Sequence, residues 1–374
     1  MPSLFLQTQN LGGATRLMPT QARSIVTDGY GRFAVETVTI GSPEREEVLV
    51  EIRASGVCHT DFDSMSWGRR MIMGHEGAGI VLATGPDVTR LRPGDRVLLN
   101  WAIPCGRCFQ CRRGAENICE SKPTVPDERY GGSLNSMFHL GTMSTHAIVP
   151  SQAVVPIHLA IPFPQASILG CCVMTGFGSV TNVAGVREGD SVVVLGCGGV
   201  GLSVIMGATH ARAGKIIAVD VNSTRLKLAK RIGATETIQS TREDVGLLNA
   251  AKRVRSITER GADFAFECTA VPSLGAAPLS MIRNGGTAVA VSGIEEVVSI
   301  DMQLFEWDKI YINPLYGQCR PFVDFPKLLS LYATGALKLD EMITRTYPLD
   351  DLAQAFEDMR LGINAKGVLL PHGA

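Results

Sequence analysis

A glycine-rich run between an apolar strand and a helix constrains the fold of this chain more than any other feature. The apolar run 191–195, SVVVL, leads directly into G-C-G-G-V-G over 196–201 and then into the helical segment LSVIMGATHA. The next apolar strand, KIIAVD, ends at Asp220, and the alternation continues through ADFAFECT and GGTAVAVSG. Strands that alternate with helices and are apolar along their length are typical of a parallel sheet covered on both faces. We therefore expect a doubly wound α/β domain over residues 173–313.

The order of strand, glycines, helix and acidic residue predicts a dinucleotide site. Gly196 permits a tight turn, Gly198 lets the backbone approach a pyrophosphate, and Gly201 allows close packing of helix on strand. The helix N-terminus offers free N–H groups to the phosphates. Asp220 would accept hydrogen bonds from the ribose hydroxyls and repel a 2′-phosphate, so the expected cofactor is NAD rather than NADP. A glycine-rich turn that binds no nucleotide is the alternative.

A loop with four closely spaced cysteines predicts a metal site. Two, two and seven residues separate its members, which are Cys105, Cys108, Cys111 and Cys119. Thiolates this close can converge on one tetrahedral cation, and zinc at about 2.3 Å from four sulfurs is the usual occupant. An iron–sulfur cluster, whose common spacings differ, and a chance grouping of core cysteines are the alternatives.

Length and charge limit the number of domains and the kinds of binding partner that the chain can have. A chain of 374 residues suggests two domains, and 35 basic against 36 acidic residues give no electrostatic footprint for nucleic acid or an anionic membrane. Ten cysteines without a secretory signal are expected to be reduced thiols and metal ligands in the cytoplasm. Residues 1–21 are expected to form a disordered lead-in, and Met18 is an alternative start.

The first part of the chain differs from the second. From about residue 22 to about residue 170, short strands are split by Gly and Pro, as in an antiparallel barrel-like domain. The tail returns to helix and strand and is expected to pack back on this part. We therefore expect one domain to comprise residues 22–172 and 314–374.

Three further residues, remote from one another in sequence, are candidate metal ligands: Cys58, His75 and Cys171. Spacing alone does not link them, and a lone buried cysteine or histidine is more often structural. Together with the glycine run and the cysteine loop, however, the sequence from about residue 23 onward resembles the zinc-dependent medium-chain alcohol dehydrogenases. The motifs that carry the resemblance are GVCHTD, GHEGAGIV, CGRCFQCRRGAENIC, LGCCVMTGFG and GCGGVGLSVIMG.

This resemblance implies a GroES-like, β-barrel-type catalytic domain beside a Rossmann domain. It makes Cys58, His75 and Cys171 the ligands of a catalytic zinc with one open position, and the loop cysteines those of a structural zinc. Asp61 resembles a group that orients the histidine ligand, and Glu76 an acid close to the metal; either carboxylate could instead be an ordinary acid. Both positions are catalytic candidates, as are two residues on the expected proton path, Thr60 and Asp63.

In the resemblance, Thr60 takes the alcohol proton first. Asp63 stands where better-known members have a histidine, so the chain leaves open whether Asp63 or water accepts the proton next. Any basic residue among the expected cofactor contacts could instead be a surface charge. The residues expected to contact the cofactor belong to the glycine run or are spread along the chain: His59, Thr175, Gly196, Gly198, Gly199, Val200, Gly201, Asp220, Arg225, Gly293 and Lys366.

Large, soft side chains without a fixed charge indicate an uncharged aliphatic or aromatic alcohol. The expected pocket residues, each of which could equally belong to the core, are Trp67, Trp101, Met143, Met174 and Ile294. Glutathione adducts are disfavoured because Pro123 stands where the related formaldehyde dehydrogenases have an arginine, although another thiol adduct stays possible. A zinc reductase of activated alkenes and a nucleotide-binding protein without hydride transfer are further alternatives. As in relatives, strand pairing between subunits predicts a homodimer or homotetramer.

Overall fold

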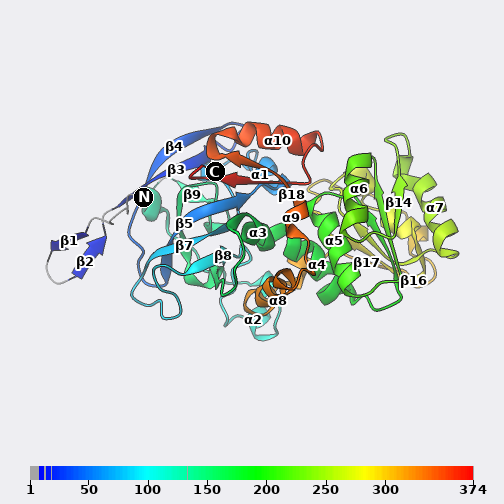
Figure 1. Ribbon diagram of the computed structural model, residues 1–374, viewed down its shortest axis with the longest axis horizontal. Coiled ribbons are helices and arrows are strands. Elements are labelled where there is room, and N and C mark those ends of the chain that lie inside the picture. The colour runs from blue at the N-terminus through cyan, green and yellow to red at the C-terminus, as the bar shows by residue number, and fades with distance from the viewer. Residues whose placement is uncertain (1–7, 12–13, 18, 133, 374) are drawn as a thin grey trace.

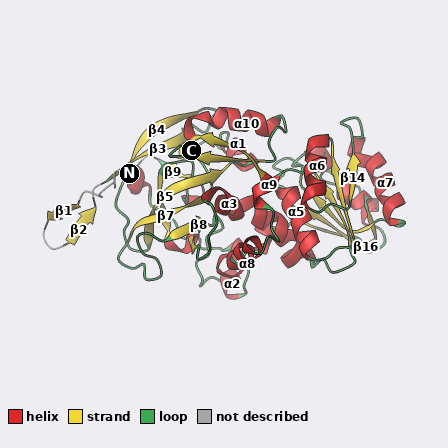
Figure 2. Ribbon diagram, viewed as in Figure 1, coloured by secondary structure: helices red, strands yellow, loops and turns green. Residues whose placement is uncertain are grey.

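The computed structural model describes residues 8–11, 14–17, 19–132 and 134–373, and it shows two parts joined by a central group of helices (Figure 1). Most strands at one end of the molecule have little helical cover, whereas helices flank the sheet at the other end (Figure 2). The two ends are the expected barrel-type and doubly wound parts.

The doubly wound part contains a six-stranded sheet in the order β14-β13-β12-β15-β16-β17, and every neighbouring pair is parallel. This arrangement confirms the Rossmann fold, in which the chain starts at the centre and moves first to one edge and then to the other. The strands are β12 (Ser191–Leu195), β13 (Lys215–Asp220), β14 (Glu236–Gln239), β15 (Ala262–Glu267), β16 (Ile282–Ala290) and β17 (Ile310–Ile312).

Three helices connect these strands: α5 (Gly199–His210), α6 (Ser223–Ile232) and α7 (Leu248–Thr258). Residues 192–195 of β12 are apolar and buried because helices cover both faces of the sheet, as expected for a parallel sheet. Helix α6 begins after Asn222, whose side chain accepts hydrogen bonds from the N–H groups of Thr224 and Arg225, so its start is locally encoded.

The barrel-type part contains a seven-stranded sheet and a four-stranded sheet. The larger sheet has the path β11-β8-β7-β5-β19-β18 with β10 also paired to β5, and the smaller has the order β4-β3-β6-β9. The strands are β3 (Thr20–Thr27), β4 (Phe33–Ile40), β5 (Glu47–Gly56), β6 (Met71–Ile72), β7 (Glu76–Thr84), β8 (Arg96–Leu99), β9 (Asn135–Ser136), β10 (His146–Pro150), β11 (Val154–Pro156), β18 (Ile343–Pro348) and β19 (Lys366–Leu370).

The C-terminal tail joins this part through its last strand, since β19 pairs with β5. Near the N-terminus, β1 (Thr8–Leu11) and β2 (Ala14–Leu17) pair antiparallel, and β3 begins at Thr20, so all described residues of the expected lead-in except Pro19 lie in strands. Residues 1–7, 12–13 and Met18 lie outside the described residues. The remaining helices are α1 (His59–Ser64), α2 (Phe109–Arg112), α3 (Phe163–Ile168), α4 (Met174–Gly178), α8 (Pro321–Ala333), α9 (Leu339–Met342) and α10 (Leu352–Arg360).

A long helical run, Phe163–Ala184, links the two parts and includes α3, α4 and two π-helical segments. Among the described residues it is the one helix long and apolar enough to cross a membrane, and 78% of its most apolar window is buried inside the protein. Val173 and Val180 share one core cluster with Val204 and Ile205 of α5 and with Ala54 of β5. One apolar core therefore extends through both parts.

Candidate active site

The three remote candidate ligands come together at the junction of the two parts. Cys58 lies at the start of α1, His75 directly before β7, and Cys171 in the π-helical segment Leu169–Val173. Their donor atoms and a carboxylate oxygen of Glu76 all lie within 4.8 Å of one another. His75 Nε2 is 3.4 Å from Cys171 Sγ, close to the roughly 3.5 Å that nitrogen and sulfur ligands of one tetrahedral zinc would show.

Asp61 holds two of these ligands in place. Its Oδ1 is 2.8 Å from His75 Nδ1, and its Oδ2 accepts a hydrogen bond of 2.8 Å from the Cys58 N–H. Burial lowers the pKa of His75, but the charge and hydrogen bond of the fully buried Asp61 outweigh this effect, so the pKa is raised well above its usual value. With Nδ1 engaged, Nε2 is the nitrogen directed at the ligand cluster. This geometry is the one expected of an orienting carboxylate.

Glu76 makes a buried ion pair with Lys366. The Lys366 ammonium lies 2.7 Å from Glu76 Oε1 and donates to the Val57 carbonyl over 2.9 Å, and the two charged side chains are 5% and 0% exposed. Burial raises the pKa of Glu76 to about 7, although the Lys366 charge opposes this. Glu76 Oε2 is buried and has no hydrogen-bond partner among the described residues. An acidic oxygen of this kind beside two thiols and an imidazole fits a site built for a cation.

The cysteine loop forms a second cluster of four donors within 4.8 Å of one another. Cys105 Sγ lies 4.0 Å from Cys111 Sγ, and Cys108 Sγ lies 3.9 Å from Cys119 Sγ. Four sulfurs at about 2.3 Å from one tetrahedral zinc would be about 3.8 Å apart, so the loop fits the ion. Backbone N–H groups also stabilise thiolates here, and the N–H of Cys111 is the main cause that lowers the pKa of Cys108 to about 6.

Aromatic rings lie next to the first cluster. The Phe138 ring centroid is 5.6 Å from that of His75, 5.2 Å from that of Trp101 and 5.8 Å from that of Trp67. The Tyr316 ring lies 4.6 Å from Trp101, and its hydroxyl donates to the Gly170 carbonyl. Phe138 thus contacts both tryptophans that were expected to line the substrate pocket. The sequence did not indicate Phe138 or Tyr316 as pocket residues. No spacing or motif marks either residue.

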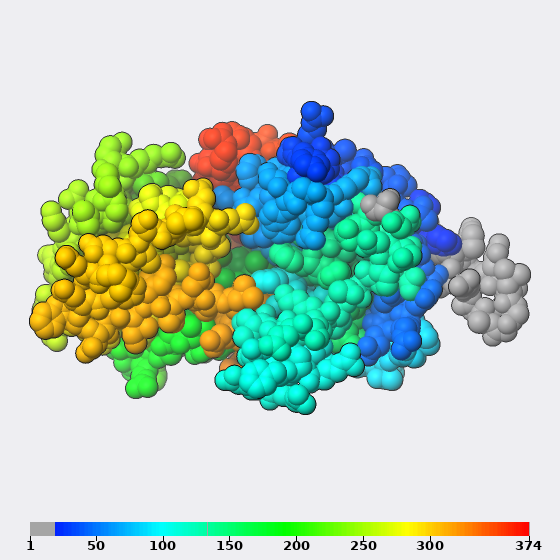
Figure 3. Space-filling model, turned by 180° about the vertical axis from the view of Figure 1, so that it is seen from behind, coloured from blue at the N-terminus to red at the C-terminus, as the bar shows by residue number. Residues whose placement is uncertain are grey.

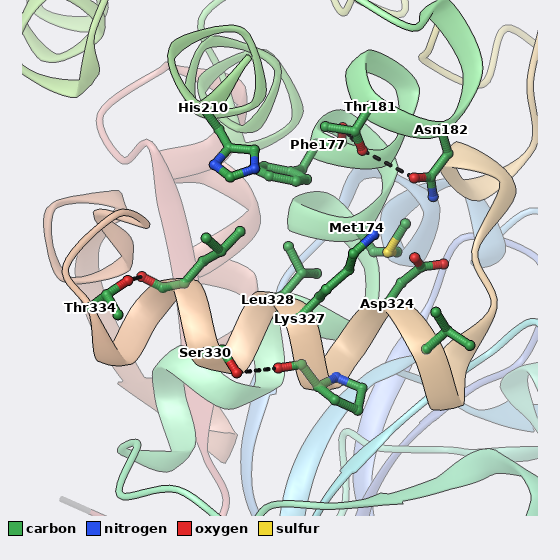
Figure 4. Close-up of a pocket in the computed structure, with 13 residues that line it drawn as sticks. Met174, Phe177, Thr181, Asn182, His210, Asp324, Lys327, Leu328, Ser330 and Thr334 are labelled. Carbon is green, nitrogen blue, oxygen red and sulfur yellow. Dashed lines mark hydrogen bonds between the residues drawn. The ribbon is translucent and has the colours of Figure 1, made fainter. Parts of the chain in front are cut away.

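The other expected pocket residues lie elsewhere or have different contacts. Met143 is fully buried in a core cluster with Met73 and Tyr347. Met174 lines a cavity of about 570 Å³ between α4, α5 and α8, and this cavity contains no donor of either cysteine cluster. Figure 4 shows Lys327 and Leu328 of α8 directed across the cavity toward α4. Ile294 lies close to Gly275. Their role in substrate binding stays a prediction.

The glycine run adopts the geometry that its sequence predicts. Gly196 has a φ of +86°, which favours glycine, and a Cβ at Gly201 would lie 1.8 Å from the Gly196 carbonyl oxygen. A Cβ at Gly198 would meet nothing within 4 Å, so the backbone there is open to a ligand. Asp220 closes the turn, because its Oδ2 accepts a hydrogen bond of 2.7 Å from the Cys197 N–H. Gly199 and Val200 begin α5 at this point.

Three further cofactor candidates have the following surroundings. Lys366 runs past the glycine run, since its Cδ lies 3.4 Å from the Cβ position of Gly199, although its ammonium is bound to Glu76. Arg225 donates to the Asn364 carbonyl over 3.4 Å. A Cβ at Gly293 would meet nothing within 4 Å.

On the catalytic side, Thr60 Oγ1 lies 3.7 Å from Cys58 Sγ. Burial raises the pKa of Asp63, while the charge of the exposed His59 opposes this rise.

In the space-filling view, the yellow and orange surface of the doubly wound part faces the blue and cyan surface of the barrel-type part at their junction (Figure 3).

Comparison with known proteins identifies the class. A family model described as the alcohol dehydrogenase GroES-like domain matches residues 44–159, and one described as zinc-binding dehydrogenase matches residues 199–333. The chain therefore belongs to the zinc-binding dehydrogenases with a GroES-like catalytic domain.

Similar curated proteins and solved structures indicate which kind of zinc-binding dehydrogenase the chain is. An NDMA-dependent alcohol dehydrogenase of Amycolatopsis methanolica is 34% identical over 362 residues, which cover 90% of this chain and 95% of that protein. An S-(hydroxymethyl)glutathione dehydrogenase of Saccharomyces cerevisiae is 32% identical, with 92% and 95% covered. The crystal structure of benzyl alcohol dehydrogenase from Acinetobacter calcoaceticus matches with a TM-score of 0.85 at 29% identity, covering 94% of this chain and 99% of that one. The protein is a zinc-dependent alcohol dehydrogenase, as its motifs predicted.

Proposed function

We propose that this enzyme transfers hydride reversibly between uncharged primary alcohols, aliphatic or aromatic, and NAD. The observation that carries the proposal is the convergence of the Cys58, His75 and Cys171 donor atoms within 4.8 Å, beside an aromatic wall made by Trp101 and Phe138. An apolar wall next to a cation site suits an alcohol whose oxygen meets the cation and whose carbon chain meets the rings.

The chain's own residues prepare the site. When bound, zinc supplies Lewis acidity at the alcohol oxygen, and NAD supplies the hydride acceptor. Asp61 holds His75 in the tautomer whose Nε2 can be a ligand, because it accepts the proton of Nδ1. Lys366 balances the charge of Glu76, so that the carboxylate can stay beside two thiolates in a buried site. The rings of Trp101, Phe138 and Tyr316 exclude water from the reacting end.

We propose that the alcohol proton leaves through Thr60 and then Asp63. Thr60 lies next to Cys58, and its hydroxyl can both accept and donate a proton. A carboxyl whose pKa is raised by burial is a better proton acceptor at neutral pH than an exposed one. Direct loss to water is the competing route.

The proposed preference for NAD over NADP rests on Asp220. Its two oxygens accept from the N–H groups of Cys197 and Asn222 over 2.7 and 2.8 Å, which fixes a carboxylate at the C-terminal end of β13. A second phosphate at the ribose would meet this negative charge. His59, Thr175, Arg225, Gly293 and Lys366 are proposed to contact other parts of the cofactor.

The test is a panel of substrates followed by NADH absorbance, with zinc content measured on the same sample. We expect turnover of benzyl alcohol and straight-chain primary alcohols, a strong preference for NAD, and two zinc equivalents per chain. Turnover of formaldehyde only in the presence of an added thiol would instead support the thiol-adduct alternative. Saturation of the C=C bond of a conjugated aldehyde would support the alkene reductase.

We also propose a homodimer or homotetramer in which the edge strand β17 pairs with its copy in a second subunit. Large apolar side chains are exposed around this edge, with Met302 74%, Trp307 71% and Ile310 51% accessible. Exposed apolar groups beside an unpaired strand are a common basis for association. Light scattering that gives the mass of a monomer would contradict this proposal.

We assign residues 22–172 and 314–374 to the catalytic domain and residues 173–313 to the cofactor domain. With a net charge of −1 and a small-molecule substrate, neither nucleic acid nor membrane is a proposed partner. A cytoplasmic location is proposed for the same enzyme.

A further inference from the structure

A buried carboxylate lies at the C-terminal edge of the parallel sheet, outside the cluster formed by Cys58, His75, Glu76 and Cys171. Glu267 is the last residue of β15 and is 0% exposed. It is in register with Leu195 of β12 on one side and Ala290 of β16 on the other. None of the ion pairs in the described ranges of the chain includes it. A buried charge without a cation has to be compensated by hydrogen bonds.

These hydrogen bonds come from two separate turns. The Thr269 N–H donates to Glu267 Oε1 over 2.6 Å, and the Thr269 hydroxyl donates to the same oxygen. The Ser292 hydroxyl donates to Oε2, and its oxygen accepts in turn from the Ala270 N–H over 3.0 Å. The carboxylate therefore ties the turn after β15 to the turn after β16.

The first of these turns lies against the glycine run. Thr269 Cγ2 is 2.9 Å from the Cβ position of Gly196, and the Cys268 N–H donates to the Leu195 carbonyl over 2.8 Å. Ala270 has a φ of +57°, an unfavourable conformation for alanine that needs fixed neighbours to persist. The backbone in this turn is thus held in an uncommon conformation by the Glu267 network.

The second turn leads directly into Gly293 and Ile294. Parallel sheets of this order bind their ligand outside the carboxyl ends of the strands, where the strand order reverses. Here that reversal lies between β12 and β15. Asp220 is on the β13 side of it, with the proposed adenosine half, whereas Glu267 and Ser292 are on the opposite side.

We propose that Glu267 is a positioning residue for the nicotinamide half of the cofactor. It acts through Thr269 and Ser292, which hold the two turns in one arrangement, and it does not itself touch the cofactor. The inference rests on the proposed use of NAD. Its consequence is that loss of the carboxylate weakens binding of the nicotinamide half and leaves the adenosine half almost unchanged.

The test compares two ligands on Glu267→Gln in the zinc-loaded enzyme. NADH contains both halves of the cofactor, whereas ADP-ribose lacks the nicotinamide. We expect NADH to bind at least tenfold more weakly than to the wild type, measured by fluorescence, and ADP-ribose to bind within threefold of the wild type, measured by calorimetry. Equal losses for both ligands, or no loss for NADH, would overturn the inference.

A matched control is available at the other end of the same strand. Asp263 accepts hydrogen bonds from the Ser191 N–H and hydroxyl over 2.8 and 2.6 Å and from Arg283 Nε over 2.6 Å. Asp263→Asn should lower stability without changing NADH affinity, because it lies at the N-terminal edge of the sheet. The same loss of NADH affinity in this variant would show that strand stability alone is responsible and would overturn the inference.

A milder variant covers the case in which Glu267→Gln does not fold. Thr269→Val removes one of the donors and keeps the shape of the side chain, and we expect NADH binding to weaken about threefold, again without a change for ADP-ribose. Unchanged NADH binding in this variant would count against the network. If the wild-type enzyme binds neither NADH nor ADP-ribose, the proposed cofactor is wrong. If the wild type and the variants bind NADH equally well, the cofactor is right and the role of Glu267 is wrong.

Discussion

Replacement of Lys366 by methionine is the sharpest test of how the active site holds its charges. Lys366 Nζ lies 2.7 Å from Glu76 Oε1, and the two side chains are 5% and 0% exposed. Methionine keeps the aliphatic stem and removes the ammonium, so Glu76 would stay buried beside Cys58 and Cys171 without a counter-charge.

The expected loss follows from burial. Two charges about 2.7 Å apart attract one another by roughly 6 kcal/mol at an effective dielectric constant of about 20. Part of this attraction offsets the cost of removing both ions from water, and breaking one member of a buried pair costs about 3–5 kcal/mol. We therefore expect Lys366→Met to lower the free energy of unfolding by about 3–5 kcal/mol at pH 8.

The loss should depend on pH in a defined direction. Burial raises the pKa of Glu76 to about 7 even with Lys366 present, and removal of the cation would raise this pKa further. At pH 6 the carboxyl is then mostly neutral in the folded variant and needs no counter-charge. The penalty should therefore be smaller at pH 6 than at pH 8.

The assay is urea unfolding of the zinc-free enzyme, in which no cation among the Cys58, His75 and Cys171 donors replaces the lost ammonium, followed by tryptophan fluorescence and circular dichroism. Arg23→Met is the matched control, because Arg23 pairs with Asp350 at the same 2.7 Å but both side chains are more than half exposed. An exposed pair contributes about 0–1 kcal/mol. If Lys366→Met costs no more than Arg23→Met, the argument from burial is refuted.

Three other predictions follow from the site and the sheets. Asp63→Asn should remove the acidic limb of the pH profile of kcat/KM, because burial raises the pKa of this proposed proton acceptor; an unaltered profile would reject the relay. Burial, with the charge of His372, lowers the pKa of His146 to about 4, so the unfolded chain binds the proton first as the pH falls, and the free energy of unfolding should drop by about 2 kcal/mol between pH 7.5 and pH 5. His146→Gln should reduce this loss in urea unfolding at pH 7.5 and pH 5, and an equal loss in both proteins would contradict the assignment. Cys108→Ser should remove one of two zinc equivalents in metal analysis, whereas loss of both would show that the two sites are not independent.

The chain alone was sufficient to predict the doubly wound domain and the cysteine loop. In both cases the signal is local: β12 and the glycines of α5 are contiguous, and the four loop cysteines lie within residues 105–119. Short-range geometry then determines the outcome, because a strand, a tight turn and a helix in that order leave few alternatives. Likewise, thiols two residues apart on a loop are near one another in any compact conformation.

The catalytic cluster is different, because Cys58, His75 and Cys171 are brought together only by packing between distant segments. The resemblance to a family indicated these residues, whereas spacing did not. Phe138 and Tyr316 were missed for the same reason, since each becomes notable only through its ring contacts with Trp101.

Charge partners are likewise a property of the folded protein. Lys366 was expected to contact the cofactor, and the sequence contains no sign that its ammonium meets Glu76, 290 residues away. The sequence around Glu267 likewise contains no sign that the Ser292 hydroxyl, in the turn after the next strand, donates a hydrogen bond to the Glu267 carboxylate. Local sequence determines which elements form, because backbone geometry and apolar periodicity act over a few residues. Which side chains meet is decided by tertiary packing, because a buried charge takes whichever partner the assembled elements place within reach.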